Sequence, residues 1–183
     1  MILPRLLSLA ALAGLLLGTS CRYDPVPQAI IDSLPPDDGE PGPNHRPGQP
    51  CNVCHSAYGG ATPVFAVAGT AFTKSMDGKL VPAANVAVTL RDSAGGKRPA
   101  CTKTSGNFYI EADNWDTITY PLSATVGDRS MSSLIGREGS CASCHKLPDE
   151  NSIDPVTGAG HDSPGVILVD VTAPGASCGG GGM

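Results

Sequence analysis

The stretch Asn85-Val86-Ala87-Val88-Thr89-Leu90-Arg91 decides the fold that this sequence predicts. Its larger apolar residues, Val86, Val88 and Leu90, alternate with smaller or polar ones. This period of two is typical of a β-strand with one side against a core and the other toward solvent. A turn-forming segment at residues 92–96 follows directly. We therefore expect a strand that ends in a tight turn.

Further strand patterns lie on both sides of this stretch. They occupy residues 64–73, 101–104, 107–112, 121–126 and 166–172, with turns at 76–79 and at Ser105-Gly106, the second joining a predicted hairpin. The 183 residues include 23 glycines and 17 prolines, and only 16% are charged, a composition that argues against a helical bundle or coiled coil. We find no convincing helical period after the N-terminal segment. The pattern predicts an all-β fold, a Greek-key β-sandwich of six to seven strands.

Residues 68–110 resemble the carboxypeptidase regulatory-like, or transthyretin-like, module. The similar positions are AGT at 68–70, Gly78, VPAANV at 81–86 and TSGNFY at 104–109. In that family the module is an accessory sandwich without catalytic residues, and the zinc-peptidase signature HExxH does not occur in this sequence. The resemblance therefore implies a fold and leaves the activity open.

The first twenty residues have the features of a secretory signal. One charge, Arg5, precedes an apolar run over residues 6–18 that is too short to span a bilayer comfortably. The run ends in LGTSC at 17–21, which resembles the lipobox of bacterial lipoproteins and implies lipidation of Cys21. Ordinary cleavage nearby is the alternative, because leucine stands one position earlier than in the usual pattern. We expect export to the periplasm or cell surface, with a lipid anchor in the outer membrane.

The segment after the signal is interpreted as a spacer. Residues 22–44 hold six prolines and five acidic residues against one basic residue, a composition typical of a semi-extended, self-repelling tether. The scattered basic residues of the remaining chain form no patch for nucleic acid. The predicted organisation is a signal at 1–20, a tether at 21–44, one β-sandwich domain at 45–174 and a flexible Gly-rich tail at 175–183.

Two pentapeptides share one pattern, CNVCH at 51–55 and CASCH at 141–145. CxxCH is the attachment signature of c-type haem, in which two cysteine sulfurs bond the porphyrin and the histidine reaches the iron. In these motifs and their flanks the chain resembles multihaem c-type cytochromes. The resemblance implies two covalently attached haems in loops at the ends of the sandwich. The cofactor-binding residues that it implies are Cys51, Cys54, His55, Cys141, Cys144 and His145.

Other interpretations of the cysteines stay open. The four motif cysteines are also compatible with an all-cysteine zinc site or with two disulfides, although neither needs a histidine after both pairs. Of the seven cysteines in the sequence, the haem motifs use four and the signal terminus one. Cys101 and Cys178 remain and are free to pair as a disulfide, with an unpaired thiol as the alternative.

Candidates for the second axial ligand of each iron are fewer. His45 lies six residues before Cys51, and His161 follows the second motif in a Gly-rich segment. Four histidines for two irons favour two bis-histidine sites. Met131, ten residues before Cys141, is the alternative at the second site, where it would raise the reduction potential relative to histidine. Met76 is a weaker alternative.

The two motifs precede the first and the last expected strands. In many sandwiches these terminal strands are parallel neighbours, so we expect both motifs at the same end of the fold. The pattern as a whole favours an exported dihaem electron carrier that acts with redox protein partners and takes no small-molecule substrate. A dihaem peroxidase or reductase would need an open iron position and acid–base groups, for which we find no motif, so we expect no catalytic residues. A cell-surface adhesion module with structural cysteines is the alternative from another class.

Overall fold

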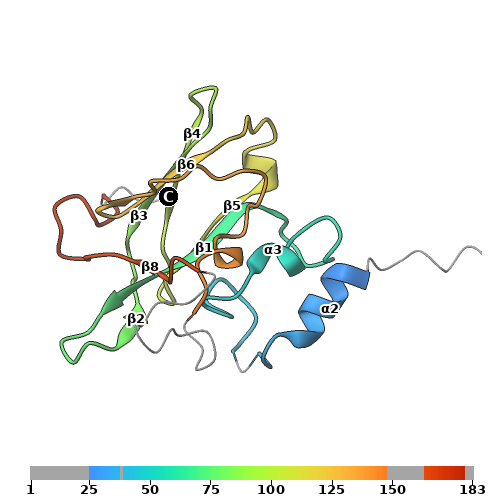
Figure 1. Cartoon of the computed structure of the whole chain (residues 1–183), viewed down its shortest axis with the longest axis horizontal. Helices are drawn as coiled ribbons and strands as arrows, with labels where there is room; N and C mark the ends of the chain where they lie inside the picture. Colours follow the sequence, from blue (N-terminus) through green and yellow to red (C-terminus); the bar gives the residue numbers. More distant parts are fainter. Residues whose placement is uncertain (1–24, 38, 148–162, 180–183) are drawn as a thin grey trace, which may run out of the picture.

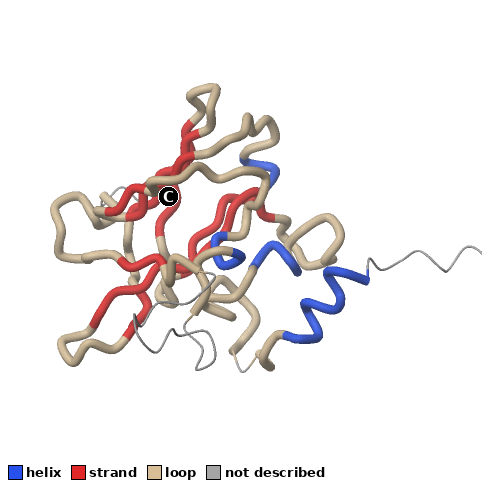
Figure 2. Tube along the Cα trace, in the orientation of Figure 1, coloured by secondary structure: helices blue, strands red, loops and turns tan. Residues whose placement is uncertain are grey.

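The computed structural model describes residues 25–37, 39–147 and 163–179, and Figure 1 shows its arrangement. Most of its regular structure is strand, in two sheets, so the prediction of an all-β fold is confirmed. Figure 2 shows most strands toward the left of the view and the longest described helix toward the right. Among the described helices, none has the length and apolar character needed to cross a membrane. The predicted signal segment and Cys21 lie outside the described residues.

The first sheet is built around β1 (Phe65–Lys74). This strand pairs antiparallel with β2 (Leu80–Pro82) and β5 (Asn107–Glu111), and parallel with β8 (Ile167–Leu168). Residues 67–72 of β1 are all buried, which shows that both faces of the strand are covered. The expectation that the first and last strands are parallel neighbours is confirmed, although β8 spans two residues rather than the predicted 166–172.

The second sheet has the order β4 (Lys97–Cys101), β3 (Ala87–Arg91), β6 (Ser123–Val126) and β7 (Arg129–Ser130), with antiparallel neighbours throughout. The alternation predicted for β3 is present, because Val88 and Leu90 are buried and the residues between and after them are exposed. These inward side chains join one hydrophobic core with residues of the first sheet, including Phe108 and Ile110. Burial of each large apolar side chain contributes about 2 kcal/mol to stability.

The predicted hairpin of 101–104 with 107–112 is wrong, although its turn is present. The Lys103 amide donates to the Asn107 carbonyl (2.8 Å), so the chain does reverse there. The strand before the turn is β4, however, which pairs with β3 in the other sheet. The turn therefore carries the chain from one sheet to the next. Gly106 has φ +77° and its backbone approaches the Ala71 carbonyl so closely that a side chain would not fit there.

The prediction of a semi-extended tether at 21–44 is wrong for residues 25–33. They form helix α2 (Pro25–Ser33). Its prolines occupy the first turn, where a helix needs no backbone N–H donor. The Gln28 side chain donates to the Asp32 carboxylate one turn later (2.7 Å), a spacing that stabilises helices. The prolines of this segment indicated a tether, so the short helix was not recognised from the sequence.

The prediction of a flexible tail at 175–183 is also wrong for its described part. Ala176 is fully buried, and its carbonyl accepts a hydrogen bond from the Ala87 amide (2.8 Å). The Cys178 amide donates to the Asn85 carbonyl (3.0 Å). Cys178 and Cys101 form a disulfide with a Cα–Cα distance of 6.1 Å. The end of the described chain is thus fastened to the second sheet.

Candidate cofactor sites at the two cysteine motifs

Each CxxCH motif folds into one short helical turn. Residues Cys51–Cys54 form α3, and Cys141–Ser143 form the 3-10 turn η2. In both motifs the histidine amide donates to the carbonyl of the first cysteine, at 2.9 Å for His55 and 2.8 Å for His145. Both cysteines and the histidine of each motif line one cavity.

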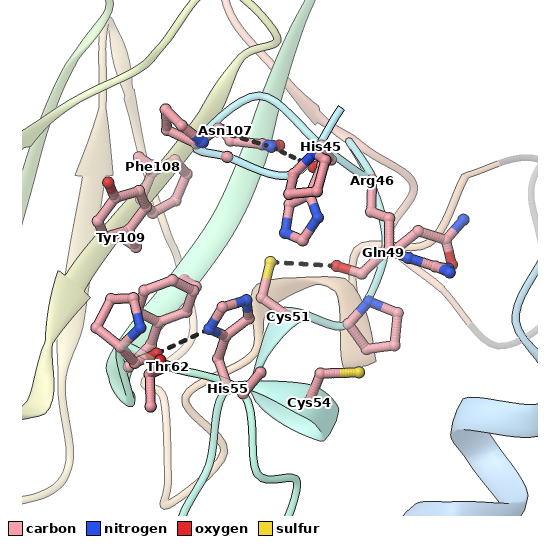
Figure 3. Close-up of a pocket in the computed structure, with 18 of the residues that line it drawn as sticks. His45, Arg46, Gln49, Cys51, Cys54, His55, Thr62, Asn107, Phe108 and Tyr109 are labelled. Carbon is pink, nitrogen blue, oxygen red and sulfur yellow. Dashed lines mark hydrogen bonds between the residues drawn. The ribbon is translucent and has the colours of Figure 1, made fainter. Parts of the chain in front are cut away.

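The first motif lines a cavity of about 520 Å³, within the size range of cofactor sites. The cavity lies between the segment that precedes α3 and strands β1 and β5, as Figure 3 shows. Both motif cysteines and both histidines of this region, His45 and His55, line it. Much of the remaining wall is apolar or aromatic, and it includes Phe65, Ala68, Phe108 and Tyr109.

Stacked rings support His55 from the sheet side. The His55 ring lies on Phe65 with centroids 4.2 Å apart, and Phe65 lies on Tyr109 with centroids 4.6 Å apart. The His55 Nδ1 atom is 2.7 Å from the Pro63 carbonyl oxygen. A carbonyl only accepts hydrogen bonds, so Nδ1 carries the proton and Nε2 keeps its lone pair. A metal bound by His55 would therefore be bound through Nε2.

His45 lies opposite His55 across the first cavity. Their ring centroids are 5.8 Å apart, and in Figure 3 the two rings point into the same space beside the Cys51 sulfur. His45 Nδ1 is 3.2 Å from an Asp37 carboxylate oxygen, which Arg46 also contacts at 3.2 Å. Desolvation opposes ionisation of Asp37, but the Gly39 amide and the charges of Arg46 and His45 lower its pKa overall. In the neutral imidazole, an Nδ1 proton directed at this carboxylate would leave the lone pair on Nε2.

The second motif lines a separate cavity of about 410 Å³. Cys141, Cys144 and His145 contribute to it, together with Met131 and mostly apolar residues of β6, β8 and the loop after β7. His145 Nδ1 is 2.8 Å from the Gly165 carbonyl oxygen, which repeats the arrangement of His55. Nε2 is again the nitrogen with a free lone pair.

The two motifs lie next to each other on β1. A Cβ atom placed on Gly69 would lie 2.7 Å from Cβ of Cys141 and 2.9 Å from Cζ of Phe108. The Ala68 amide donates to the Gly139 carbonyl just before the second motif (2.9 Å), and Phe108 lines both cavities. In Figure 1 the orange turn η2 lies beside α3 and β1. The fold therefore brings together two motifs that are ninety positions apart in the sequence.

Two buried oxygen atoms beside the motifs have no hydrogen-bond partner within the described residues. They are Oδ1 of Asn52, inside the first motif, and Oγ of Ser140, directly before the second. Buried polar atoms are nearly always satisfied by protein, water or a bound group. Each motif thus has, within it or directly before it, one buried oxygen atom that could still form a hydrogen bond.

The described structure shows the state of the four motif cysteines in the absence of any bound group. Its four motif cysteines are unpaired thiols, and nowhere in the described ranges do three Cys, His, Asp or Glu side chains gather as metal ligands would. Burial, with the neighbouring Cys51 charge, raises the pKa of the Cys141 thiol to about 12. A zinc ion bound at Cys141 would therefore have to displace the thiol proton.

We expect the thiols of the cofactor-free protein to react in a fixed order. Cys144 is exposed, whereas burial raises the pKa of both Cys141 and Cys51. Only the thiolate reacts with iodoacetamide, so Cys144 should be modified first and Cys141 last at pH 8. Timed alkylation followed by peptide mass spectrometry measures the order, with the unfolded chain as the control in which rates converge. Cys141 reacting as fast as Cys144 would contradict the burial of its sulfur.

The structure separates the remaining candidates for axial ligands. His45 lies in the first cavity and Met131 in the second, whereas Met76 is fully exposed in the turn after β1. His161 lies outside the described residues. Sequence reasoning missed Asp37, which it assigned to a solvated spacer, and the aromatic wall, whose residues carry no motif.

Comparison with protein-family models, with curated proteins and with solved structures finds no match to this chain. The functional argument therefore depends on the two motifs, the cavities that they line and the hydrogen bonds of their histidines.

Proposed function

We propose that this protein is an exported dihaem c-type cytochrome that passes electrons between redox protein partners. One observation carries the proposal: each CxxCH histidine donates its Nδ1 proton to a backbone carbonyl and lies in an apolar cavity with both sulfurs of its motif. Histidine ligands of metals are held in this way. Neither zinc nor disulfide chemistry needs the same arrangement at both motifs.

Covalent attachment uses the four motif thiols. Each S–H adds across one vinyl group of the porphyrin, so that sulfur bonds one carbon and the hydrogen goes to the other, with no oxidant or reductant consumed. The single helical turns favour this reaction, because they place both cysteines and the histidine of a motif in the lining of one cavity. The neutral state of Cys141 matches a reaction that starts from the thiol.

The distance between His45 and His55 supports a ligand pair at the first motif. Metal–nitrogen bonds to imidazole are about 2 Å long, so two rings on opposite sides of one metal have centroids about 6 Å apart. The 5.8 Å between His45 and His55 is close to this value. Asp37 would orient His45 as the Pro63 carbonyl orients His55.

The surroundings of the first cavity favour a carrier over an enzyme. An iron porphyrin bound there would supply a one-electron couple, with a partner protein as donor and another as acceptor. The polar side chains near His45 are engaged within the protein: Arg46 contacts Asp37 and donates to the Pro35 carbonyl (2.8 Å), and the Asn107 amide donates to the His45 carbonyl (2.8 Å). They hold the ligand segment in place and leave no evident acid–base group for substrate.

The wider proposal includes the architecture and location expected from the sequence. The two sheets would form a Greek-key sandwich with the haem loops at one end, and a lipid on Cys21 would hold the protein at the outer membrane. The contact between the motifs at Gly69 and Phe108 supports rapid electron exchange between neighbouring haems. The disulfide between Cys101 and Cys178 suits an oxidising compartment.

The proposal is tested by the haem content of the full chain. We expect two haems per chain in a pyridine haemochrome assay, and a covalent haem stain after denaturing electrophoresis, when the chain is exported alongside the cytochrome c maturation system. The same chain produced without that system is the control and should bind none covalently. A haem-free product from both hosts would instead favour the adhesion module.

A further inference from the structure

We propose that the two sites have different axial ligands, with the Met131 sulfur at the CASCH site and the His45 imidazole at the CNVCH site. This inference rests on the proposed dihaem function and deepens it. It assigns to this chain one haem of higher and one of lower reduction potential, in contact with each other.

The lining of the second cavity carries the assignment. Among its described residues, Met131 is the one side chain outside the motif that has a sulfur or imidazole donor. The Glu138 carboxylate, which also lies there, accepts a hydrogen bond from the Ser140 amide (2.7 Å). Thioether sulfur opposite histidine is an established ligand pair of haem iron. The lining of this cavity therefore includes both members of that pair, His145 and Met131.

The backbone of Met131 is also fixed in position beside the second cavity. It directly follows β7, and its amide donates to the Ala124 carbonyl of β6 (2.9 Å). Its side chain is half-buried against the hydrophobic core. Met76, by contrast, is fully exposed and lines neither cavity. Only one of these two methionines is positioned by the fold.

The proposed first site differs from the second in its donor, an imidazole rather than a thioether, and in the carboxylate charge beside that donor. The imidazole of His45 contacts the Asp37 carboxylate, which makes it a more electron-rich ligand and favours the oxidised iron. Methionine at the second site favours the reduced iron. Electrons that enter the pair would therefore settle on the CASCH site.

The test compares M131L with M76L in the haem-loaded full chain. The oxidised wild type should show the weak far-red absorption band of a sulfur-to-iron bond, and M131L should lose it. Reduced M131L should bind about one carbon monoxide per chain, because leucine opens one iron position, whereas M76L should match the wild type. M131H should lose the band but stay closed to carbon monoxide, and the higher of the two midpoint potentials should fall toward the lower.

Other outcomes separate this inference from the proposed function. H45A should keep the far-red band and open the other iron to carbon monoxide. Two haems without the band in the wild type, or a band that persists in M131L, would overturn the Met131 assignment alone. The same follows if H161A, rather than M131L, opens the CASCH site. A chain without any haem would overturn the proposed function and this inference together.

Discussion

Replacing Cys51 and Cys54 by serine is expected to halve the covalent haem content, from two haems to one per chain. A serine hydroxyl does not add to a vinyl group under the conditions at which a thiol does, so the CNVCH site would keep no thioether. The CASCH site should stay loaded, because its own sulfurs, its His145 and its cavity are separate from those of the first motif. Haemochrome absorbance per chain and intact-protein mass measure the result.

The reciprocal variant is the matched control. C141S/C144S should also carry one haem, and the fourfold serine variant should carry none. The two single-haem proteins should differ in spectrum, since each retains a different site. Both double variants retaining two haems would show that attachment does not use these sulfurs. Loss of both haems from either one would show that the sites cannot be filled independently.

Removing the disulfide is expected to lower the free energy of unfolding by about 4 kcal/mol. The Cys101–Cys178 bond joins residues 77 positions apart, and closing so long a loop restricts the unfolded chain strongly. The native contacts of this region remain in C101S/C178S, because Cys178 still donates its amide to Asn85. Guanidinium denaturation of the haem-loaded wild type and variant, followed by far-UV circular dichroism, measures the difference.

Reductant provides the control for this prediction. Dithiothreitol should destabilise the wild type by about the same amount and leave C101S/C178S unchanged, since the thioethers are not reducible disulfides. Both proteins should hold two haems in the native state. A difference below about 1 kcal/mol between wild type and variant would contradict a disulfide that constrains the unfolded chain.

The sequence predicted those parts of the fold that depend on local pattern. The alternation of Val86, Val88 and Leu90 is a local signal, and it gave the correct strand and its buried face. The sheet to which a strand belongs is not a local property. The turn at Gly106 was recognised from its residues, but its role in joining two sheets depends on a close approach to Ala71 in another strand.

For the candidate sites, too, the local features were predicted from the sequence and the features that depend on distant residues were not. A CxxCH motif places its own donors within five residues, so both motifs were visible in the sequence. The cavity walls were not, because Phe65, Phe108 and Tyr109 reach the first motif only through the pairing of β1 with β5. The contact of His45 with Asp37 was missed for a different reason. The acidic and proline-rich composition around Asp37 dominated the interpretation, although the two residues are only eight positions apart.

Gly69 gives this fold an evolutionary constraint of an unusual kind. Its backbone is ordinary extended strand, so no glycine-specific torsion angle maintains it. What excludes every other amino acid is the nearness of Cys141 and Phe108, which even a methyl group would strike. The requirement for glycine at this position therefore comes from the small space between a strand, the CASCH turn and a core side chain. A larger residue at position 69 would be accommodated only if both the CASCH turn and the Phe108 ring moved away from β1.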